Sequence, residues 1–397
     1  MPAFITRVRL HNYKSIADCD VQLGELTFVV GPNGSGKSNF LDALRLVADA
    51  LNAPLDHAIR DRGGINDVRR RSQGHPNNFS IRLDFVLPDG APGHFAFEVH
   101  APAKGVFQIK KEQCSAGVMP TERYVVESGV LTECTVASPP AVGGADRFYL
   151  VNLSGHPAFR PVFDALSNMG FYNPVPAVIR EVQPPHPGQI LGRDGHNLAS
   201  VLGRLEETSP AIKERVESFL AKVVPGTEGV RRESFANKET LEFRQVVQGS
   251  KAAWRFYANS MSDGTLRALA VLVALFQTRG DGSSPVPLVG IEEPESALHP
   301  YATSVLLEAL QEASRKTQVI VTSHSPDLLD NKGLRDDQIL AVESNGGTTT
   351  VGAVSPGARE AIRQQLYTPG ELHRMHQLVQ DAEVQKVTGR QLDLFEA

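Results

Sequence analysis

The stretch that decides the fold is residues 26–38, Leu26-Thr27-Phe28-Val29-Val30 followed by Gly31-Pro32-Asn33-Gly34-Ser35-Gly36-Lys37-Ser38. The first five residues form a short, mostly apolar run that predicts a buried strand. Residues 39–47 place apolar side chains at helical spacing, so a helix is expected after the glycines. A strand, a glycine-rich loop and a helix in this order predict a loop that binds phosphate groups.

The residue types in this loop suit a nucleoside triphosphate. Glycines allow main-chain N–H groups to turn towards phosphate oxygens, and the start of a helix adds a positive dipole and further donors. Lys37 is expected to reach the β- and γ-phosphates, and Ser38 to ligate Mg²⁺. The predicted phosphate cradle consists of Gly31, Asn33, Gly34, Ser35, Gly36, Lys37 and Ser38.

A second apolar run, residues 286–291, ends in two adjacent carboxylates, Glu292 and Glu293. Its lack of alternation predicts a central parallel strand. Two neighbouring carboxylates are costly unless they meet a cation. We expect Glu292 to hold Mg²⁺, directly or through water, and Glu293 to orient or deprotonate the attacking water. The alternative is a plain strand end with solvated acids.

Two further segments add to this pattern. Ser262-Asp263-Gly264 precedes the strongly apolar residues 268–276, so Ser262 is a predicted helix N-cap and Gly264 permits a close backbone approach. The turn predicts a second anion site, one that reaches the phosphates of a second subunit. His324 ends the apolar run 318–321 and can sense a γ-phosphate by donating a hydrogen bond to it.

Together these motifs resemble the ATP-binding-cassette (ABC) ATPases, specifically the SMC, RecF and OLD branch. In that resemblance residues 31–38 are the Walker A loop with Asn39 after it, Ser262 to Gly264 are the signature turn, and Glu292-Glu293 are the Walker B pair. The run Glu293-Pro294-Glu295-Ser296-Ala297-Leu298-His299-Pro300 looks like the OLD-type string and contains the D-loop.

The resemblance extends to the beginning of the chain, where residues 5–16 contain Asn12-Tyr13-Lys14-Ser15. It implies that Lys14 and Asn39 approach the nucleotide, that the nucleotide is ATP with Mg²⁺, and that His324 is the switch histidine. It implies an α/β P-loop ABC ATPase head working as an ATP-bound homodimer. The signature differs from the usual Leu-Ser-Gly-Gly-Gln wording, and Gln73 is a weak candidate for the Q-loop glutamine.

Composition agrees with an intracellular enzyme. The 397 residues suffice for one ATPase domain with a large insertion, and the net charge of −5 does not indicate nucleic-acid binding. Cys19, Cys114 and Cys134 have neither metal nor disulfide spacing and are expected to be reduced thiols. We see no signal peptide and no apolar run that approaches 18 residues, so a cytoplasmic protein without its own membrane span is expected.

The motifs divide the chain into predicted parts. Residues 1–152 form an N-terminal ATPase lobe, in which residues 3–30 give two strands and residues 79–136 an antiparallel sheet. Residues 153–225 form a helical insertion, with helices over 157–168, 197–205 and 210–223 and loops over 174–195. Residues 226–356 form the C-terminal ATPase lobe, and residues 357–397 form helices and a mobile tail. The absence of a heptad run excludes long coiled-coil arms.

Two segments bear on partners. Residues 59–72 carry five arginines that could follow nucleic-acid phosphates, form a solvated loop or contact the bound nucleotide: Arg60, Arg62, Arg69, Arg70 and Arg71. Residues 391–395, Gln391-Leu392-Asp393-Leu394-Phe395, resemble the peptide by which bacterial repair proteins dock on the sliding clamp, with Leu394 and Phe395 filling an apolar cleft. The alternative is an amphipathic end that packs on the chain's own core.

The sequence therefore predicts an ATPase that dimerises on ATP and controls either DNA transactions or a separately encoded effector, as in phage defence or DNA repair. The alternative function is an ATP-gated scaffold or sensor that holds and releases a partner effector without binding DNA. Only 73 residues follow His324, and they hold no acidic cluster for a two-metal nuclease, so an effector would be a separate protein.

Overall fold

The computed structural model describes residues 4–71, 76–103, 106–117, 121–144, 146–250, 252–279, 284–381 and 394–395. The chain divides into two compact units, the first formed by residues 1–169 and 332–397 and the second by residues 170–331. The phosphate loop therefore belongs to the first unit. The carboxylate pair, the turn at Ser262 and His324 belong to the second unit.

The first unit is built on a mixed sheet whose strands lie in the order β8-β7-β6-β5-β4-β1-β2-β16-β15-β3. Neighbours from β8 to β2 are antiparallel, as are β15 and β16, whereas β16 with β2 and β15 with β3 are parallel. The predicted antiparallel sheet is thus confirmed. The strands are β1 (Ile5–Tyr13), β2 (Ile16–Gln22), β3 (Leu26–Val30), β4 (Asn78–Val86), β5 (Pro92–Ala103), β6 (Val106–Ala116), β7 (Glu122–Glu127), β8 (Val130–Cys134), β15 (Ile339–Asn345) and β16 (Thr348–Ala353).

Residues 3–30 contain three strands, so the prediction of two strands was wrong. The chain reverses after Tyr13, which pairs with Ile16 across a tight turn. Asn12 and Lys14 adopt positive φ angles of 54° and 48°, the left-handed conformation that such a turn requires. The polar run at this turn therefore separates two strands, with β3 following as the third.

Helices cover the apolar face of this sheet. The longest helix, α1, packs against α2 and α5, and the rings of Phe95 and Phe97 lie 5.3 and 4.6 Å from the ring of Phe148. Phe79, Phe95 and Phe97 are fully buried. The helices of the first unit are α1 (Lys37–Asn52), α2 (Leu55–Arg60), α3 (Ile65–Val68), α4 (Tyr149–Asn152), α5 (Arg160–Ser167), α12 (Pro356–Arg363) and α13 (Pro369–Arg374), with the 3-10 turn η2 (Asp336–Gln338).

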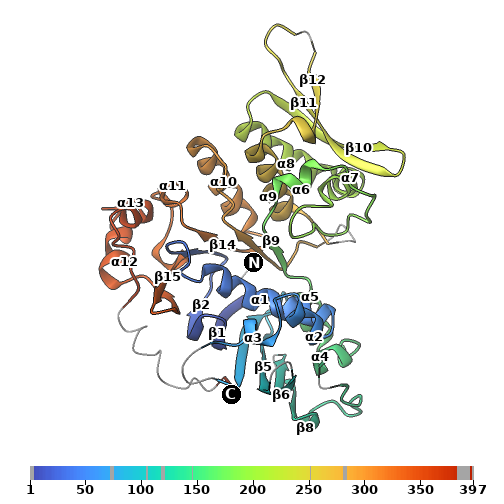
Figure 1. The fold of residues 1–397 in the computed structure, drawn as a ribbon, viewed down its shortest axis with the longest axis vertical. Helices are drawn as coiled ribbons and strands as arrows, with labels where there is room; N and C mark the ends of the chain where they lie inside the picture. The colour runs from blue at the N-terminus through green and yellow to red at the C-terminus, as the bar shows by residue number, and fades with distance from the viewer. Residues whose placement is uncertain are drawn as a thin grey trace. The chain divides into compact units, whose positions relative to one another are not determined.

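The second unit has a small parallel sheet, ordered β14-β13-β9, and a separate three-stranded antiparallel sheet (Figure 1). The central helix α9 is buried continuously from Thr265 to Leu275, which explains its strongly apolar sequence. The elements are β9 (Gly170–Tyr172), α6 (Pro176–Arg180), α7 (Leu198–Thr208), α8 (Pro210–Val223), β10 (Thr227–Phe235), β11 (Lys238–Gln245), β12 (Trp254–Tyr257), η1 (Ala258–Ser260), α9 (Asp263–Phe276), β13 (Leu288–Glu292), α10 (Pro300–Ala313), β14 (Gln318–Ser323) and α11 (Pro326–Leu329).

Most predicted elements of residues 153–260 are found. The helices predicted over 157–168, 197–205 and 210–223 correspond to α5, α7 and α8. Within 174–195, predicted as loops, residues 176–180 form the short helix α6, which begins with a proline at its first position. The predicted domain boundaries at 152, 225 and 356 stay predictions.

Candidate functional site

The phosphate loop joins β3 to α1 as predicted. Gly36 is the N-cap of α1 with φ 103° and provides no side-chain cap, so a ligand can serve as the acceptor for the first turn. A Cβ at Gly36 would lie 2.2 Å from Thr349 Oγ1, and one at Gly31 would lie 2.2 Å from the carbonyl oxygen of Val342. A Cβ at Gly34 would meet nothing within 4 Å. Neighbouring atoms therefore fill the space next to Gly31 and Gly36, whereas the space at Gly34 is open to a phosphate group.

Lys37 lies in the first turn of α1 with 5% of its surface exposed. Its Nζ donates to the carbonyl oxygens of Gly31 and Pro32 at 2.9 and 3.0 Å, so the ammonium closes the loop on itself. Ser38 and Asn33 are exposed and Ser35 is buried. Ser38 and Asn33 are thus accessible to a ligand, and their predicted roles in binding Mg²⁺ and phosphate stay predictions.

Two other segments of the first unit support the loop. Asn39 Nδ2 donates to Ser15 Oγ at 2.7 Å, and Ser15 Oγ lies 2.7 Å from Thr349 Oγ1. Thr349 in turn donates to the carbonyl oxygen of Ser35 at 2.7 Å. The turn after β1 and the strand β16 therefore fix the loop from one side. For Asn39 the structure gives this supporting contact, and its predicted contact with the nucleotide stays a prediction.

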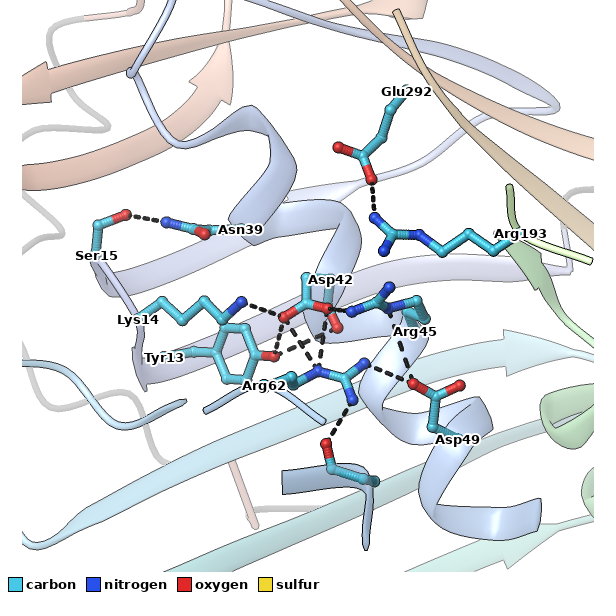
Figure 2. A network of polar contacts seen from close by, with 11 residues as sticks. Tyr13, Lys14, Ser15, Asn39, Asp42, Arg45, Asp49, Arg62, Arg193 and Glu292 are labelled. Carbon is cyan, nitrogen blue, oxygen red and sulfur yellow. Dashed lines mark hydrogen bonds and ion pairs between the residues drawn. The ribbon is translucent and has the colours of Figure 1, made fainter. Parts of the chain in front are cut away.

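Lys14, also predicted to approach the nucleotide, points at the side of α1 instead (Figure 2). Its Nζ lies 2.6 Å from Asp42 Oδ2. Asp42 also accepts from Tyr13 (2.8 Å), Arg45 (2.5 Å) and Arg62 (3.0 Å). Burial alone would raise the pKa of Asp42, but the charges of Arg62, Arg45 and Lys14 outweigh it and lower this pKa to about 2.

All five arginines of residues 59–71 bond residues of their own chain, although the side chains of Arg60 and Arg71 are 70% and 72% exposed. Arg62, whose side chain is 1% exposed, bonds Asp42 and Asp49 beside α1 and cannot reach an external phosphate. For Arg62, both a nucleic-acid contact and a solvated loop are therefore wrong, because the spacing of charges does not reveal a buried acid more than ten residues away. The other four bond Asp56 (Arg60), Asn66 and Ala101 (Arg69), Thr348 (Arg70) and Asp67 (Arg71).

In the second unit the two adjacent glutamates diverge. Glu292, the last residue of β13, accepts from Arg193 Nη2 at 2.6 Å (Figure 2). Glu293 has a positive φ of 43°, and its side chain turns to His324, whose Nδ1 lies 3.0 Å from Glu293 Oε1. The structure thus pairs the predicted base with the predicted sensor. Arg193, which sequence reasoning missed, provides the cation for Glu292.

Arg267 holds the turn after β13 in place. It lies in α9, is 8% exposed, and donates to the carbonyl oxygens of Glu292 and Glu293 at 2.9 and 3.0 Å. It also donates to Pro174 O and Asn173 Oδ1. Burial lowers its pKa, although nearby glutamates partly offset this effect. Arg267, in the helix that follows the signature turn, therefore holds the main chain of residues 292 and 293, and no sequence motif indicates this role.

The signature turn has the expected local structure. Ser262 is the N-cap of α9, with its Oγ accepting from the Thr265 amide at 3.2 Å, which confirms the predicted cap. The close approach that Gly264 permits is filled by the D-loop of the same chain, because a Cβ there would lie 2.5 Å from the carbonyl oxygen of Ala297. Contact of Ser262 and Gly264 with a second subunit's nucleotide stays a prediction.

The remaining predicted features have mixed outcomes. Gln73 and residues 391–393 lie outside the described residues. Leu394 is 3% exposed, so the alternative of a tail packing on its own chain describes this residue. Cys19, Cys114 and Cys134 are free thiols, and burial raises the pKa of Cys19 and Cys114. Within the described ranges, no set of three or more His, Cys, Asp or Glu side chains could hold a metal, and each helix is too short or too polar to span a bilayer.

The fold defines the class of protein. It resembles the structure of an SMC head bound to the C-winged helix domain of ScpA, with a TM-score of 0.56 and 17% identity over 90% of this chain and 99% of that one. An SMC head derived from Pyrococcus furiosus gives 0.57, with 14% identity over 92% and 100%. The chain has a P-loop ABC ATPase fold.

The family follows from a sequence model that matches residues 26–99 and 166–330, more than half of the chain. The chain belongs to this family, described as "AAA domain, putative AbiEii toxin, Type IV TA system". The two matched segments contain the phosphate loop, the signature turn, the carboxylate pair and His324. This places the chain among SMC-, RecF- and OLD-like ATPases.

Curated relatives match shorter segments. A RecF replication and repair protein from Gloeobacter violaceus is 30% identical over 22% of this chain. An OLD nuclease from Thermus scotoductus is 44% identical over 11%, and a chromosome partition protein Smc from Desulfitobacterium hafniense is 49% identical over 13%. The matches span 24%, 8% and 5% of those proteins.

Proposed function

We propose that this protein hydrolyses ATP as a homodimer and thereby controls DNA transactions or a separately encoded effector, in phage defence or DNA repair. The observation that carries the proposal is the loop 31–38, in which Lys37 is buried against two carbonyl oxygens and the space at Gly34 is open. Family membership and the names of the relatives, an OLD nuclease and a RecF protein, support it.

The residues of each unit have separate roles in this proposal. In the first unit, the loop and Lys37 bind the β- and γ-phosphates, and Ser38 is a ligand for Mg²⁺. In the second unit, Glu292, which bonds Arg193 through Oε1, would be the other residue to hold Mg²⁺, directly or through water. When bound, Mg²⁺ offsets the charge that develops on the phosphates.

Glu293 is the proposed base for the attacking water. Its carboxylate lies beside Nδ1 of His324, so the histidine limits its orientation. The main-chain oxygens of residues 292 and 293 are fixed by Arg267, which limits it further. His324 is also the proposed donor of a hydrogen bond to the γ-phosphate. The contact between Glu293 and His324 supports these two roles.

The decisive experiment is Glu293→Gln, with phosphate release and the ATP-dependent molecular mass as readouts. We expect ATP binding to persist, turnover to fall on the order of 10²–10⁴-fold, and a closed dimer to accumulate. The matched control is Glu308→Gln, because Glu308 lies on α10 in an exposed pair with Lys222. Near wild-type turnover by Glu293→Gln would show that the base is another residue.

A second candidate function is an ATP-gated scaffold that holds and releases an effector without binding DNA. The specific observation in its favour is the burial of Arg62, whose side chain is 1% exposed, because it takes one of the five arginines of residues 59–72 out of reach of DNA. Turnover stimulated by DNA, with a steep salt dependence, would favour the first function. Turnover indifferent to DNA but altered by the product of an adjacent gene would favour the scaffold.

A further inference from the structure

The antiparallel sheet of the first unit has two different faces. Side chains alternate along each strand, so Phe95 and Phe97 on β5 face the aromatic core whereas Ala96 faces the other way. Arg82 on β4 and Gln113 on β6 both pair with Ala96, so the three form one row across the strands. The row puts the smallest side chain between two long polar ones, which makes a hollow on the sheet.

This hollow is covered, although it lies on the face away from the core. Ala96 is fully buried, and Arg82 and Gln113 are 5% and 7% exposed. Residues 394 and 395 lie there. Arg82 Nη1 donates to the carbonyl oxygen of Leu394 at 3.0 Å, and Gln113 Nε2 lies 3.5 Å from that of Phe395.

Side chains add to these main-chain contacts. Leu394 is 3% exposed, so nearly all of its apolar surface is removed from water. Lys111 Nζ lies 5.1 Å from the centre of the Phe395 ring, within the range of a cation–π contact. Residues of neighbouring strands thus contact one aromatic ring and two carbonyl acceptors, and the Leu394 side chain is buried beside them.

His94 orients the side-chain amide of Gln113. Gln113 Nε2 lies 3.0 Å from His94 Nε2, and His94 Nδ1 lies 3.0 Å from Ser115 Oγ. Burial and the charge of Arg82 lower the pKa of His94 to about 4, so the ring is neutral and Nε2 accepts from Gln113. Gln113 therefore keeps its amide as a donor, and donors are what a peptide carbonyl requires.

We propose that Arg82, Ala96, Lys111 and Gln113 form a peptide-binding site, the tail site, which this chain fills in cis with its own Leu394 and Phe395. The ligand class is a short peptide with a leucine followed by an aromatic residue. These two side chains are also the ones predicted from the sequence to enter a partner's apolar cleft. A partner that takes this segment must therefore compete with the tail site.

The test uses the full chain and a fluorescent peptide of residues 385–397. Leu394→Asp combined with Phe395→Asp opens the site without changing it. Because a tethered ligand has an effective concentration on the order of 1 mM, wild type should bind the peptide about tenfold or more weakly than this open variant, if the peptide binds the open site with a Kd of about 100 µM or less.

Site variants are then made in the open background. Ala96→Leu fills the hollow and should abolish peptide binding. Lys111→Ala should weaken binding several-fold, whereas the adjacent Lys110→Ala, which loses only a pair with Glu98 at 3.0 Å, should not. Lys111→Ala keeps the test valid if Ala96→Leu does not fold.

Three outcomes would overturn the proposal. The first is no binding of 1 mM peptide to the open variant, and the second is equal binding to the open variant and wild type. The third is a wild-type protein that binds the peptide more tightly when the protein is diluted. That result would mean that the tail of a second copy, not the chain's own tail, occupies the tail site.

Discussion

Replacing Asp42 with asparagine should destabilise the first unit strongly. Asp42 is the shared acceptor for four side chains, and Arg62 is the most deeply buried of its three cationic partners, with a side chain that is 1% exposed. Asparagine fits the same space but carries no charge, so Arg62 keeps only Asp49 as a charged partner, through Nη2 at 2.7 Å. The variant therefore leaves the buried guanidinium of Arg62 with one carboxylate partner instead of two.

The size of the effect follows from the carboxylate's pKa. A pKa lowered from 3.8 to about 2 means that the fold favours ionised Asp42 by about 2 kcal/mol, at about 1.4 kcal/mol per unit. The under-compensated Arg62 adds to this cost. Breaking a buried pair by removing one partner typically costs about 3–5 kcal/mol, and we expect Asp42→Asn to fall in that range.

Urea denaturation at pH 7 measures the effect, and Asp49→Asn is the matched control. Both aspartates bond Arg62, but Asp49 is 43% exposed, so its loss should cost less than about 1 kcal/mol. Equal costs for the two variants would refute the argument from burial.

The pH dependence provides a second check. Because the folded pKa of Asp42 is depressed, its contribution is complete above the unfolded value of 3.8 and is lost as pH falls to about 2. The difference in unfolding free energy between wild type and Asp42→Asn should narrow across this window. A difference that stays constant from pH 5 to pH 2 would show that the charge of Asp42 is not its source.

Three further predictions concern other parts of the fold. Gly36→Ala should lower the unfolding free energy by about 1–3 kcal/mol, measured by urea titration, because φ is 103° and the new Cβ meets Thr349. Arg267→Met should cost about 2–4 kcal/mol, since its buried carbonyl acceptors lose their donor. Burial raises the pKa of Glu112 to about 7, so wild-type stability should fall as pH rises from 4.5 to 7, and Glu112→Gln should remove that slope in thermal melts.

The sequence predicted the parts of the site whose signal is local. The apolar run 26–30, the glycines and the helical spacing after them are contiguous, and the structure has β3, the loop and α1 at those residues. The cap at Ser262 is equally local, because an N-cap bonds an amide three residues later. A sequence motif predicts the correct structural element where each residue bonds partners that lie within about one helical turn of it in the sequence.

Arginines were the residues that the sequence could not place. Arg62 was counted with four neighbours as one basic segment, yet its partners lie 13 and 20 residues earlier on α1. Arg193 and Arg267 bond residues 99 and 25–26 positions away. A long side chain with several donors finds such partners only after the chain has folded, so charge spacing alone does not separate a buried arginine from a solvated one.

The carboxylate pair shows that the order of charges in the sequence also does not settle whether two acids share a metal ion. Adjacent Glu292 and Glu293 were expected to need a cation. Among the described residues, Arg193 bonds Glu292, and His324 Nδ1 lies 3.0 Å from Glu293 Oε1. The positive φ at Glu293 and the bonds from Arg267 to both carbonyl oxygens separate the two side chains. Adjacency therefore does not imply a shared metal. Arg193 bonds Oε1 of Glu292, which leaves the second carboxylate oxygen available to a cation, and Arg193, 47% exposed, is accessible enough to move if both oxygens are needed.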